Sequence, residues 1–173
     1  MKTLIIQGSP RKKAYTKVLA QFAYNHAKTK CTADILDLSE ADIEPFKGFE
    51  EKYSEKTNDA IKSVKSCDAY ILCTPVYDSM ISSALKNLFE HINYKEIVGK
   101  TAGFIIMASG KIAYLHVHSQ LTTMMNYFGV SSNSEAVYAS HEHFNEQMNL
   151  KDEAIKRRIQ EVVDSTIKTN SSG

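Results

Sequence analysis

The chain has 173 residues and a formal net charge of +1, from 21 Lys and Arg against 20 Asp and Glu. That length fits one domain, and 43% hydrophobic beside 24% charged residues exclude a chain that is disordered throughout. Because the balanced charge creates no overall field to attract nucleic acid or an anionic membrane, we expect small-molecule partners and a local origin for any anion site.

The apolar runs are too short to cross a membrane. The longest, residues 69–73 and 104–108, are far below the roughly 20 residues that a bilayer span requires. The start of the chain passes from a short apolar run directly into Gly8 and Ser9, which does not fit a secretory signal peptide. We therefore expect a cytoplasmic protein that does not enter a membrane.

Short runs rich in β-branched residues predict five strands. They cover residues 3–6, 33–38, 69–74, 102–107 and 136–138. The segments between them have helical spacing, which is typical of βαβ units and of a parallel sheet with helices on both faces. The sequence thus predicts a doubly wound α/β fold with a five-stranded parallel sheet.

Apolar stripes predict the helices. The clearest stripe repeats at i, i+3, i+4, i+7, i+8 and i+11, and consists of Ile81, Ala84, Leu85, Leu88, Phe89 and Ile92. Further stripes lie in residues 18–27, 117–128 and 155–167, and a weaker one in 58–66.

The remaining segments carry no such stripe. The polar segment 39–56 is either a functional loop or hides a short helix. We expect residues 1–168 to form a single domain and residues 169–173 a flexible tail.

The loop after the first predicted strand has the composition of an anion site. It joins a buried strand to a helix N-terminus, whose N–H groups and dipole favour a phosphate. Ser9 and Thr16 add hydroxyl groups, and Arg11 adds a fork of donors. The loop lacks the further glycines of a dinucleotide fingerprint, and Lys13 stands where an ATPase P-loop requires Gly, so a mononucleotide is favoured. The alternative is an ordinary turn in which Thr16 caps the helix and residues 11–13 are a solvated basic run.

Two further loops are expected at the same edge of the sheet, where parallel strands place their carboxyl ends. After the third strand, Pro75 has no N–H, and Tyr77 offers an aromatic face and a hydroxyl group to a heterocycle. After the fourth, Ser109 and Gly110 let the backbone approach a ring closely. Each loop is also compatible with a plain turn, with Ser79 starting the next helix after the third strand, and it is their shared edge that favours a binding site.

The segments GSPRKKAYT (residues 8–16) and TPVYDSMISSALKN (residues 74–87) resemble the NAD(P)H-dependent FMN reductase family, and the order of elements is similar over nearly the whole chain. The resemblance implies a flavodoxin-like fold and an NAD(P)H-dependent FMN oxidoreductase, with FMN as cofactor and NADPH or NADH as co-substrate. Hydride would pass from the nicotinamide to FMN in a ping-pong cycle and on to a small acceptor such as a flavin, quinone or azo compound. Members of the family are generally homodimers or tetramers.

The resemblance also implies the cofactor contacts, residue by residue. It maps Ser9, Arg11 and Thr16 to the FMN phosphate and residues 75–78 to the isoalloxazine and ribityl groups. The cofactor-binding candidates are Ser9, Arg11, Thr16, Pro75, Val76, Tyr77, Asp78, Ser109 and Gly110. Ala14 stands where the family often has Ser, which weakens one phosphate contact, and Val76 replaces a common acid at the rim of the flavin. We expect no catalytic side chain, because the flavin carries the redox chemistry.

Several other groups are interpreted as structural. His116 and His118 are too far apart around a helix to hold one metal, and residues 141–143 are interpreted as a solvated loop, so no metal site is expected. The three cysteines form no Cys-x-x-Cys pair and are expected to be reduced and inert. The apolar group Met124, Met125, Tyr127 and Phe128 is expected to fill core or subunit interface.

We expect a homodimer built on the helices at residues 81–93 and 113–127. The alternative function is a flavodoxin-type electron carrier without nicotinamide oxidation, although such carriers are usually strongly acidic. A third alternative is a flavin-free regulatory module on the same fold.

Overall fold

The computed structural model describes residues 1–171, apart from the side chains of residues 111 and 169–171. Its centre is a parallel sheet of β1 (Lys2–Gln7), β2 (Thr32–Asp37), β3 (Ala69–Pro75), β4 (Thr101–Met107), β5 (Ser131–Ser132) and β6 (Val137–Ala139). The order is β2-β1-β3-β4-β5, and β6 also pairs with β4. The chain leaves β1 for one edge and then crosses to β3 on the other side, so the strand order reverses between β1 and β3.

The last sheet position is shared by two short strands. β5 pairs with the start of β4, at Thr101 and Ala102, and β6 with its end, at residues 105–107. The sheet therefore has the five strand positions that were predicted, and all five predicted runs are strands. β5 was not predicted because its two serines carry no apolar signal.

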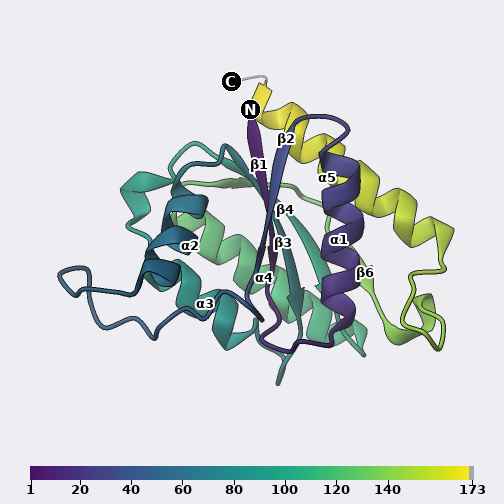
Figure 1. Ribbon diagram of the computed structural model, residues 1–173. Helices are drawn as coiled ribbons and strands as arrows, with labels where there is room; N and C mark the ends of the chain where they lie inside the picture. The colour runs from purple at the N-terminus through teal and green to yellow at the C-terminus, as the bar shows by residue number, and fades with distance from the viewer. Residues whose placement is uncertain (172–173) are drawn as a thin grey trace.

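Helices cover both faces of the sheet (Figure 1). α1 (Tyr15–Ala27) and α5 (Glu153–Ser171) lie on one face, and α2 (Glu55–Lys65), α3 (Ser83–Glu90) and α4 (Lys111–Tyr127) lie on the other. Successive residues of β1 face the two layers, since Leu4 and Ile6 pack with α2, α3 and α4 while Ile5 packs with α1 and α5. The doubly wound α/β fold is thus confirmed.

The close approach of α5 to β4 depends on a glycine. Gly103 lies in β4, and a Cβ atom there would meet Thr166 and Val162 of α5. Glycine therefore lets α5 pack directly on the centre of the sheet.

The helix ends follow their capping residues. α3 begins at Ser83, two residues after the first residue of the apolar stripe, because the Ser82 side chain accepts a hydrogen bond from Leu85 N. Ser54 likewise starts α2 at Glu55, and no helix lies in residues 39–54. α5 continues to Ser171, so it includes the first three residues of the expected tail 169–173, whose last two lie outside the described residues. Within residues 1–171, no helix has both the length and the apolar character of a membrane span.

Candidate cofactor site

A cavity of about 430 Å³ opens at the carboxyl ends of β1, β3 and β4, where the strand order reverses. It is lined by Ser9, Arg11, Lys13, Ala14, Tyr15, Thr16, Pro75, Val76, Tyr77, Met107, Ala108, Ser109, His141 and Met148. Its volume lies within the range of roughly 300–1,000 Å³ that is usual for small-molecule sites. The three predicted loops therefore form one site.

The first loop presents the N-terminus of α1 to this cavity. Ala14, at the N-cap, has no side-chain oxygen, and the first turn of α1 contains no acid. Backbone N–H groups and the positive end of the dipole are therefore available to an anion. Arg11 and Lys13 line the same wall, so the loop has the donors that a phosphate requires.

The hydroxyl groups of this loop are already engaged. Ser9 is fully buried, and its Oγ lies 3.2 Å from Tyr77 Oη and accepts a hydrogen bond from Arg11 N at 3.2 Å. Thr16 is the second residue of α1, and its Oγ1 donates to Gln7 Oε1 at 3.2 Å. The alternative in which Thr16 caps the helix is thus not what the structure contains.

Two contacts hold the first loop against the second. Gly8 N donates to Cys73 O at 2.7 Å, and a Cβ atom on Gly8 would lie only 3.0 Å from that oxygen. Ser82 Oγ donates to Gly8 O, so the residue that caps α3 also fixes the turn after β1. A side chain at position 8 would crowd this crossing, which favours glycine there.

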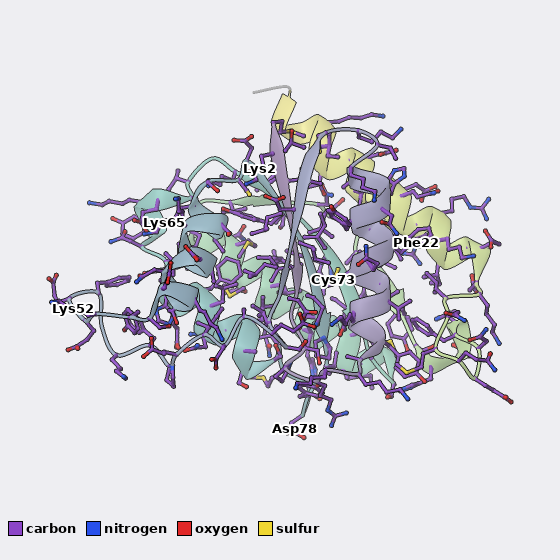
Figure 2. All side chains as sticks on the ribbon, in the orientation of Figure 1. Lys2, Phe22, Lys52, Lys65, Cys73 and Asp78 are labelled. Carbon is purple, nitrogen blue, oxygen red and sulfur yellow. The ribbon has the colours of Figure 1, made fainter. Side chains whose placement is uncertain are left out.

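The second loop is a tight reversal of the chain. Tyr77 and Met80 pair through hydrogen bonds of 3.1 and 2.8 Å, and the two residues between them, Asp78 and Ser79, have φ of 49° and 62°. These are the left-handed conformations of a type I′ turn. Tyr77 lines the cavity, with its ring centroid 5.3 Å from Arg11 Cζ, whereas Asp78 is exposed at the tip and points away from the molecule (Figure 2).

The third loop contributes less than was expected. Met107, Ala108 and Ser109 line the cavity, but Gly110 is the N-cap of α4 and lies outside the lining. Of the nine candidate residues, the structure brings together Ser9, Arg11, Thr16, Pro75, Val76, Tyr77 and Ser109. Asp78 and Gly110 are not among the residues that line the cavity.

Seven lining residues were not among the candidates: Lys13, Ala14, Tyr15, Met107, Ala108, His141 and Met148. Tyr15 lies in the first turn of α1, and its ring centroid is 4.9 Å from that of His141. His141 and Met148 belong to the segment after β6, of which residues 141–143 were interpreted as solvated loop. His141 is indeed exposed, but β6 ends at the same edge of the sheet as β4. That position after a predicted strand was the available signal.

The charge of the lining favours an anionic ligand. Arg11 and Lys13 are cationic, and no Asp or Glu is among the described residues that line the cavity. Cys73 lies behind it in β3, where burial raises the pKa of its thiol and keeps it protonated. Within the described part of the chain, no three His, Cys, Asp or Glu residues form a cluster that could hold a metal.

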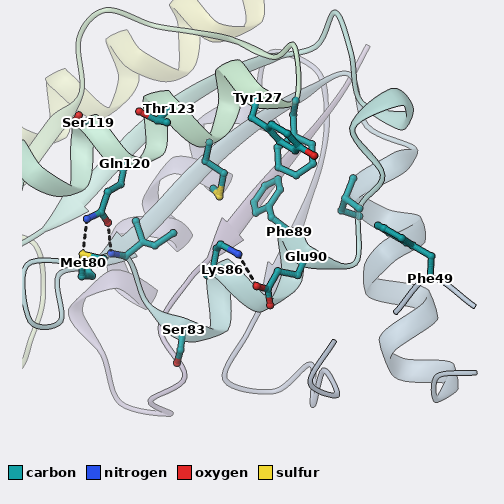
Figure 3. A pocket seen from close by; sticks show the side chains of 14 residues that line it. Phe49, Met80, Ser83, Lys86, Phe89, Glu90, Ser119, Gln120, Thr123 and Tyr127 are labelled. Carbon is teal, nitrogen blue, oxygen red and sulfur yellow. Dashed lines mark hydrogen bonds and ion pairs between the residues drawn. The ribbon is translucent and has the colours of Figure 1, made fainter. Parts of the chain in front are cut away.

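A second cavity lies between α3 and α4, beside the hairpin at 77–80 (Figure 3). Its volume is about 920 Å³. Its apolar lining is Phe49, Met80, Ile81, Phe89, Ile92, Met124, Tyr127 and Phe128. We call it the α3/α4 groove. Met80 and Tyr127 are exposed at its edges, whereas Met125 and Phe128 are buried in the core.

Comparison with known proteins supports a flavin site. Residues 1–144 match the NADPH-dependent FMN reductase family. The chain is 30% identical over 148 residues to an NAD(P)H-dependent FAD/FMN reductase of Geobacillus thermodenitrificans, with 83% of this chain and 80% of the relative covered. It is 31% identical over 128 residues to an FMN-dependent NADPH-azoreductase of Staphylococcus aureus, with 68% of each chain covered.

The fold is also similar to that of a solved flavoenzyme. The NAD(P)H:acceptor oxidoreductase of Paracoccus denitrificans superposes with a TM-score of 0.80 at 19% identity, over 99% of this chain and 97% of that chain. At this identity the likeness concerns the fold alone.

Proposed function

The chain belongs to the NADPH-dependent FMN reductase family, and we propose that the cavity at the carboxyl ends of β1, β3 and β4 is where it holds FMN. The protein is an NAD(P)H-dependent FMN oxidoreductase that passes electrons from the nicotinamide to FMN and on to an acceptor. The observation that carries the assignment of the site is the meeting of an uncapped helix N-terminus, Arg11 and Tyr77 in one cavity without a carboxylate among its described lining residues.

The donor set fits the two ends of FMN. At one end, Arg11 and the N–H groups at the start of α1 match a phosphate in charge and in donor geometry. At the other end, Pro75, Val76 and Tyr77 offer flat and apolar surface, and the backbone of Ser109 offers an amide group. The N–H groups of Val76, Tyr77 and Ala108 already donate to backbone carbonyls. Bound FMN supplies the hydride chemistry.

The residues of the chain therefore bind and orient. We propose that Ser9, Arg11 and Thr16 hold the phosphate end, and that Pro75, Val76, Tyr77 and Ser109 hold the ring. Asp78 and Gly110 act through the turns they form, since neither lines the cavity. We propose no general acid or base among them, because hydride transfer to a flavin does not require one.

We further propose a homodimer formed through the α3/α4 groove. Ile112 and Leu115 of α4 are 73% and 59% exposed, and Met80 and Tyr127 are 56% and 69% exposed at the groove. Large exposed apolar side chains are typical of an interface. We also propose that the protein works in the cytoplasm, where NAD(P)H is available. Residues 1–168 act as one domain. The electron donor is either NADPH or NADH, and the acceptor is a flavin, quinone or azo compound.

Reconstitution tests this function. The purified chain is stripped of flavin and titrated with FMN, and its visible spectrum is recorded. Oxidation of NADPH and of NADH is then followed with free flavin, quinone and azo acceptors. We expect a yellow protein that oxidises a nicotinamide in the presence of at least one acceptor. A protein that binds FMN but oxidises neither nicotinamide would be an electron carrier, and a colourless one would be a flavin-free module.

A further inference from the structure

We propose that Asp37 and Gln7 act as a pair of positioning residues for the anion site, with the Asp37 carboxylate orienting the Gln7 amide and Gln7 holding Ser9 and Thr16 in place. Neither residue lines the cavity. The inference rests on the proposed binding of the FMN phosphate at the first loop.

Gln7 is the last residue of β1 and is fully buried. Its Oε1 accepts hydrogen bonds from Ser9 N and Thr16 Oγ1. Its Nε2 donates to Ser9 O at 3.0 Å and to Asp37 Oδ1 at 2.8 Å. The amide thus uses both acceptor positions and both donors, and it holds Ser9 at its N–H and its C=O simultaneously.

Asp37 determines which way this amide points. It is directly opposite Gln7 in the β1–β2 register. Its Oδ1 also accepts from Ser39 N at 2.9 Å and Ser39 Oγ at 2.7 Å, and its Oδ2 pairs with Lys17 Nζ at 2.8 Å. An ionised carboxylate only accepts hydrogen bonds, so the NH₂ group of Gln7 has to face Asp37 and its oxygen has to face Ser9 and Thr16.

The carboxylate stays ionised despite its partial burial. Burial raises the pKa of Asp37, but hydrogen bonds from Lys17, Ser39 and Gln7 outweigh this effect and hold the pKa below its ordinary value. At neutral pH the orientation of the Gln7 amide is therefore maintained.

This arrangement changes which groups meet the ligand. The hydroxyl proton of Thr16 and the N–H of Ser9 are both given to Gln7. The donors left for an anion are Arg11 and the backbone N–H groups at the start of α1, that of Thr16 included. The Ser9 hydroxyl joins them when Tyr77 Oη is the donor in the contact between the two hydroxyl groups. Gln7 therefore supports the phosphate by fixing the path of the loop from which these donors project.

The variant Asp37→Asn tests the pair. It preserves shape but replaces the carboxylate with a neutral amide, which loses the ion pair with Lys17. Because an Asn side chain can present either its oxygen or its NH₂ group, it no longer forces the NH₂ group of Gln7 to face it. The matched control is Asp34→Asn, three residues earlier on β2, where an exposed carboxylate pairs with Lys2 Nζ at 2.7 Å. Dissociation constants for FMN and for riboflavin, which lacks the phosphate, are measured by fluorescence titration of the flavin-free proteins, together with their melting temperatures.

We expect Asp37→Asn to weaken FMN binding about tenfold, which is the effect of losing about one hydrogen bond to a charged group. Riboflavin binding should change less than about twofold. Asp34→Asn should leave both constants unchanged. Ser39→Ala, which removes one hydrogen bond from Asp37 Oδ1 and keeps the carboxylate, should give a smaller shift in the same direction and serves if Asp37→Asn does not fold.

The outcomes separate this inference from the proposed function. A merely structural role for Asp37 would weaken FMN and riboflavin binding equally as the melting temperature falls, and that result would overturn the inference. The inference would also be overturned if Asp37→Asn gave the same two dissociation constants as Asp34→Asn while Arg11→Ala still weakened FMN binding selectively. If wild-type protein binds no FMN, or if Arg11→Ala has no selective effect, the proposed phosphate site itself is wrong.

Discussion

Arg11 combines three properties in the first loop: a permanent charge, a planar fork of donors and a place in the wall of the cavity. Its guanidinium carbon also lies 5.3 Å from the centroid of the Tyr77 ring. The contact links the phosphate end of the site to the aromatic residue of the second loop. Removal of this side chain should therefore weaken chiefly the binding of a ligand that carries a phosphate.

We expect Arg11→Ala to weaken FMN binding roughly 10-fold to 100-fold, because a hydrogen bond to a charged group contributes about 1.5–3 kcal/mol. Riboflavin binding should change little. Titration of both ligands measures the difference, with Lys12→Ala as the control, since Lys12 is exposed and does not line the cavity. Equal responses to the two substitutions would mean that residues 11–13 are only a solvated basic run.

Unlike Arg11, the three cysteines do not line the cofactor cavity. Cys67 and Cys73 are buried and Cys31 is half-buried. Burial raises the pKa of the Cys67 and Cys73 thiols, so neither is a thiolate at neutral pH.

A variant with all three cysteines changed to Ala should fold, bind FMN and oxidise NAD(P)H at close to the wild-type rate. Ala is chosen over Ser because a serine at position 73 would bury a hydroxyl group in an apolar strand. Steady-state oxidation of NADPH by the flavin-loaded variant makes the comparison. A folded, FMN-loaded variant without activity would show that a thiol takes part in the reaction.

At the scale of elements, the hairpin at 77–80 and the start of α3 tie the loops together. Ser82 accepts from Leu85 N as the cap of α3 and donates to Gly8 O in the first loop. One buried hydroxyl group thus satisfies a helix N–H group and a loop carbonyl. Its removal leaves both without that partner.

We expect Ser82→Ala to lower the free energy of unfolding by about 1–3 kcal/mol, from the lost cap and the buried carbonyl left unsatisfied. Ser83→Ala, at the exposed neighbouring position, should change it by no more than about 0.5 kcal/mol. Urea denaturation of the two variants gives the values. A Ser82 variant as stable as the Ser83 variant would contradict the double role of this hydroxyl.

Gln120 holds the other side of the same hairpin. From α4, its Oε1 accepts a hydrogen bond from Ile81 N at 3.0 Å, and its Nε2 lies against Met80 Sδ and 3.5 Å from Ser79 O (Figure 3). Asp78 and Ser79 have left-handed backbones, which cost energy in residues other than glycine. The position of Tyr77 therefore depends on contacts made outside the turn.

Gln120→Ala should weaken the binding of FMN and riboflavin to the same extent, a few-fold, because it loosens the part of the site that holds the ring. This equal loss would distinguish it from Arg11→Ala. Gln21→Ala removes a glutamine from an exposed face of α1, where its amide bonds only Asn25, and should have no effect. A selective loss of FMN binding in the Gln120 variant would contradict the assignment of the hairpin to the ring.

At the scale of the whole molecule, the two cavities share the hairpin. Tyr77 lines the cofactor cavity, and Met80, three residues later, lines the α3/α4 groove. A second copy seated on the groove would therefore lie next to the flavin site and would cover Tyr127.

We expect the wild-type protein to have the mass of a dimer in solution and Tyr127→Glu to shift it to the monomer, because a carboxylate buried in an apolar interface loses its hydration. Ile35→Glu places the same charge on an exposed apolar residue of the edge strand β2 and should leave the dimer intact. Sedimentation velocity at micromolar concentration separates the states. A monomeric wild-type protein with bound FMN would contradict the proposed interface.

The sequence by itself determined the layered α/β fold and the loops that form the site. Strands buried on both faces have to be apolar throughout, and helices on a sheet have to be apolar along one stripe, so both are visible in the order of residues. The loop composition around Arg11 and Tyr77 was equally visible, because anion and ring recognition require particular residue types.

Only the tertiary structure decided which side chains of those loops enter the cavity. Two left-handed residues turn Asp78 outward while Tyr77 stays inside, and the pairing of β6 with the end of β4 brings in His141. Helix phase buried Met125 and exposed Tyr127. Such outcomes depend on turn geometry and on neighbours far away in the chain. Gln7 is the clearest case, because its role depends on hydrogen bonds to Asp37, Ser9 and Thr16 that only the folded chain brings together.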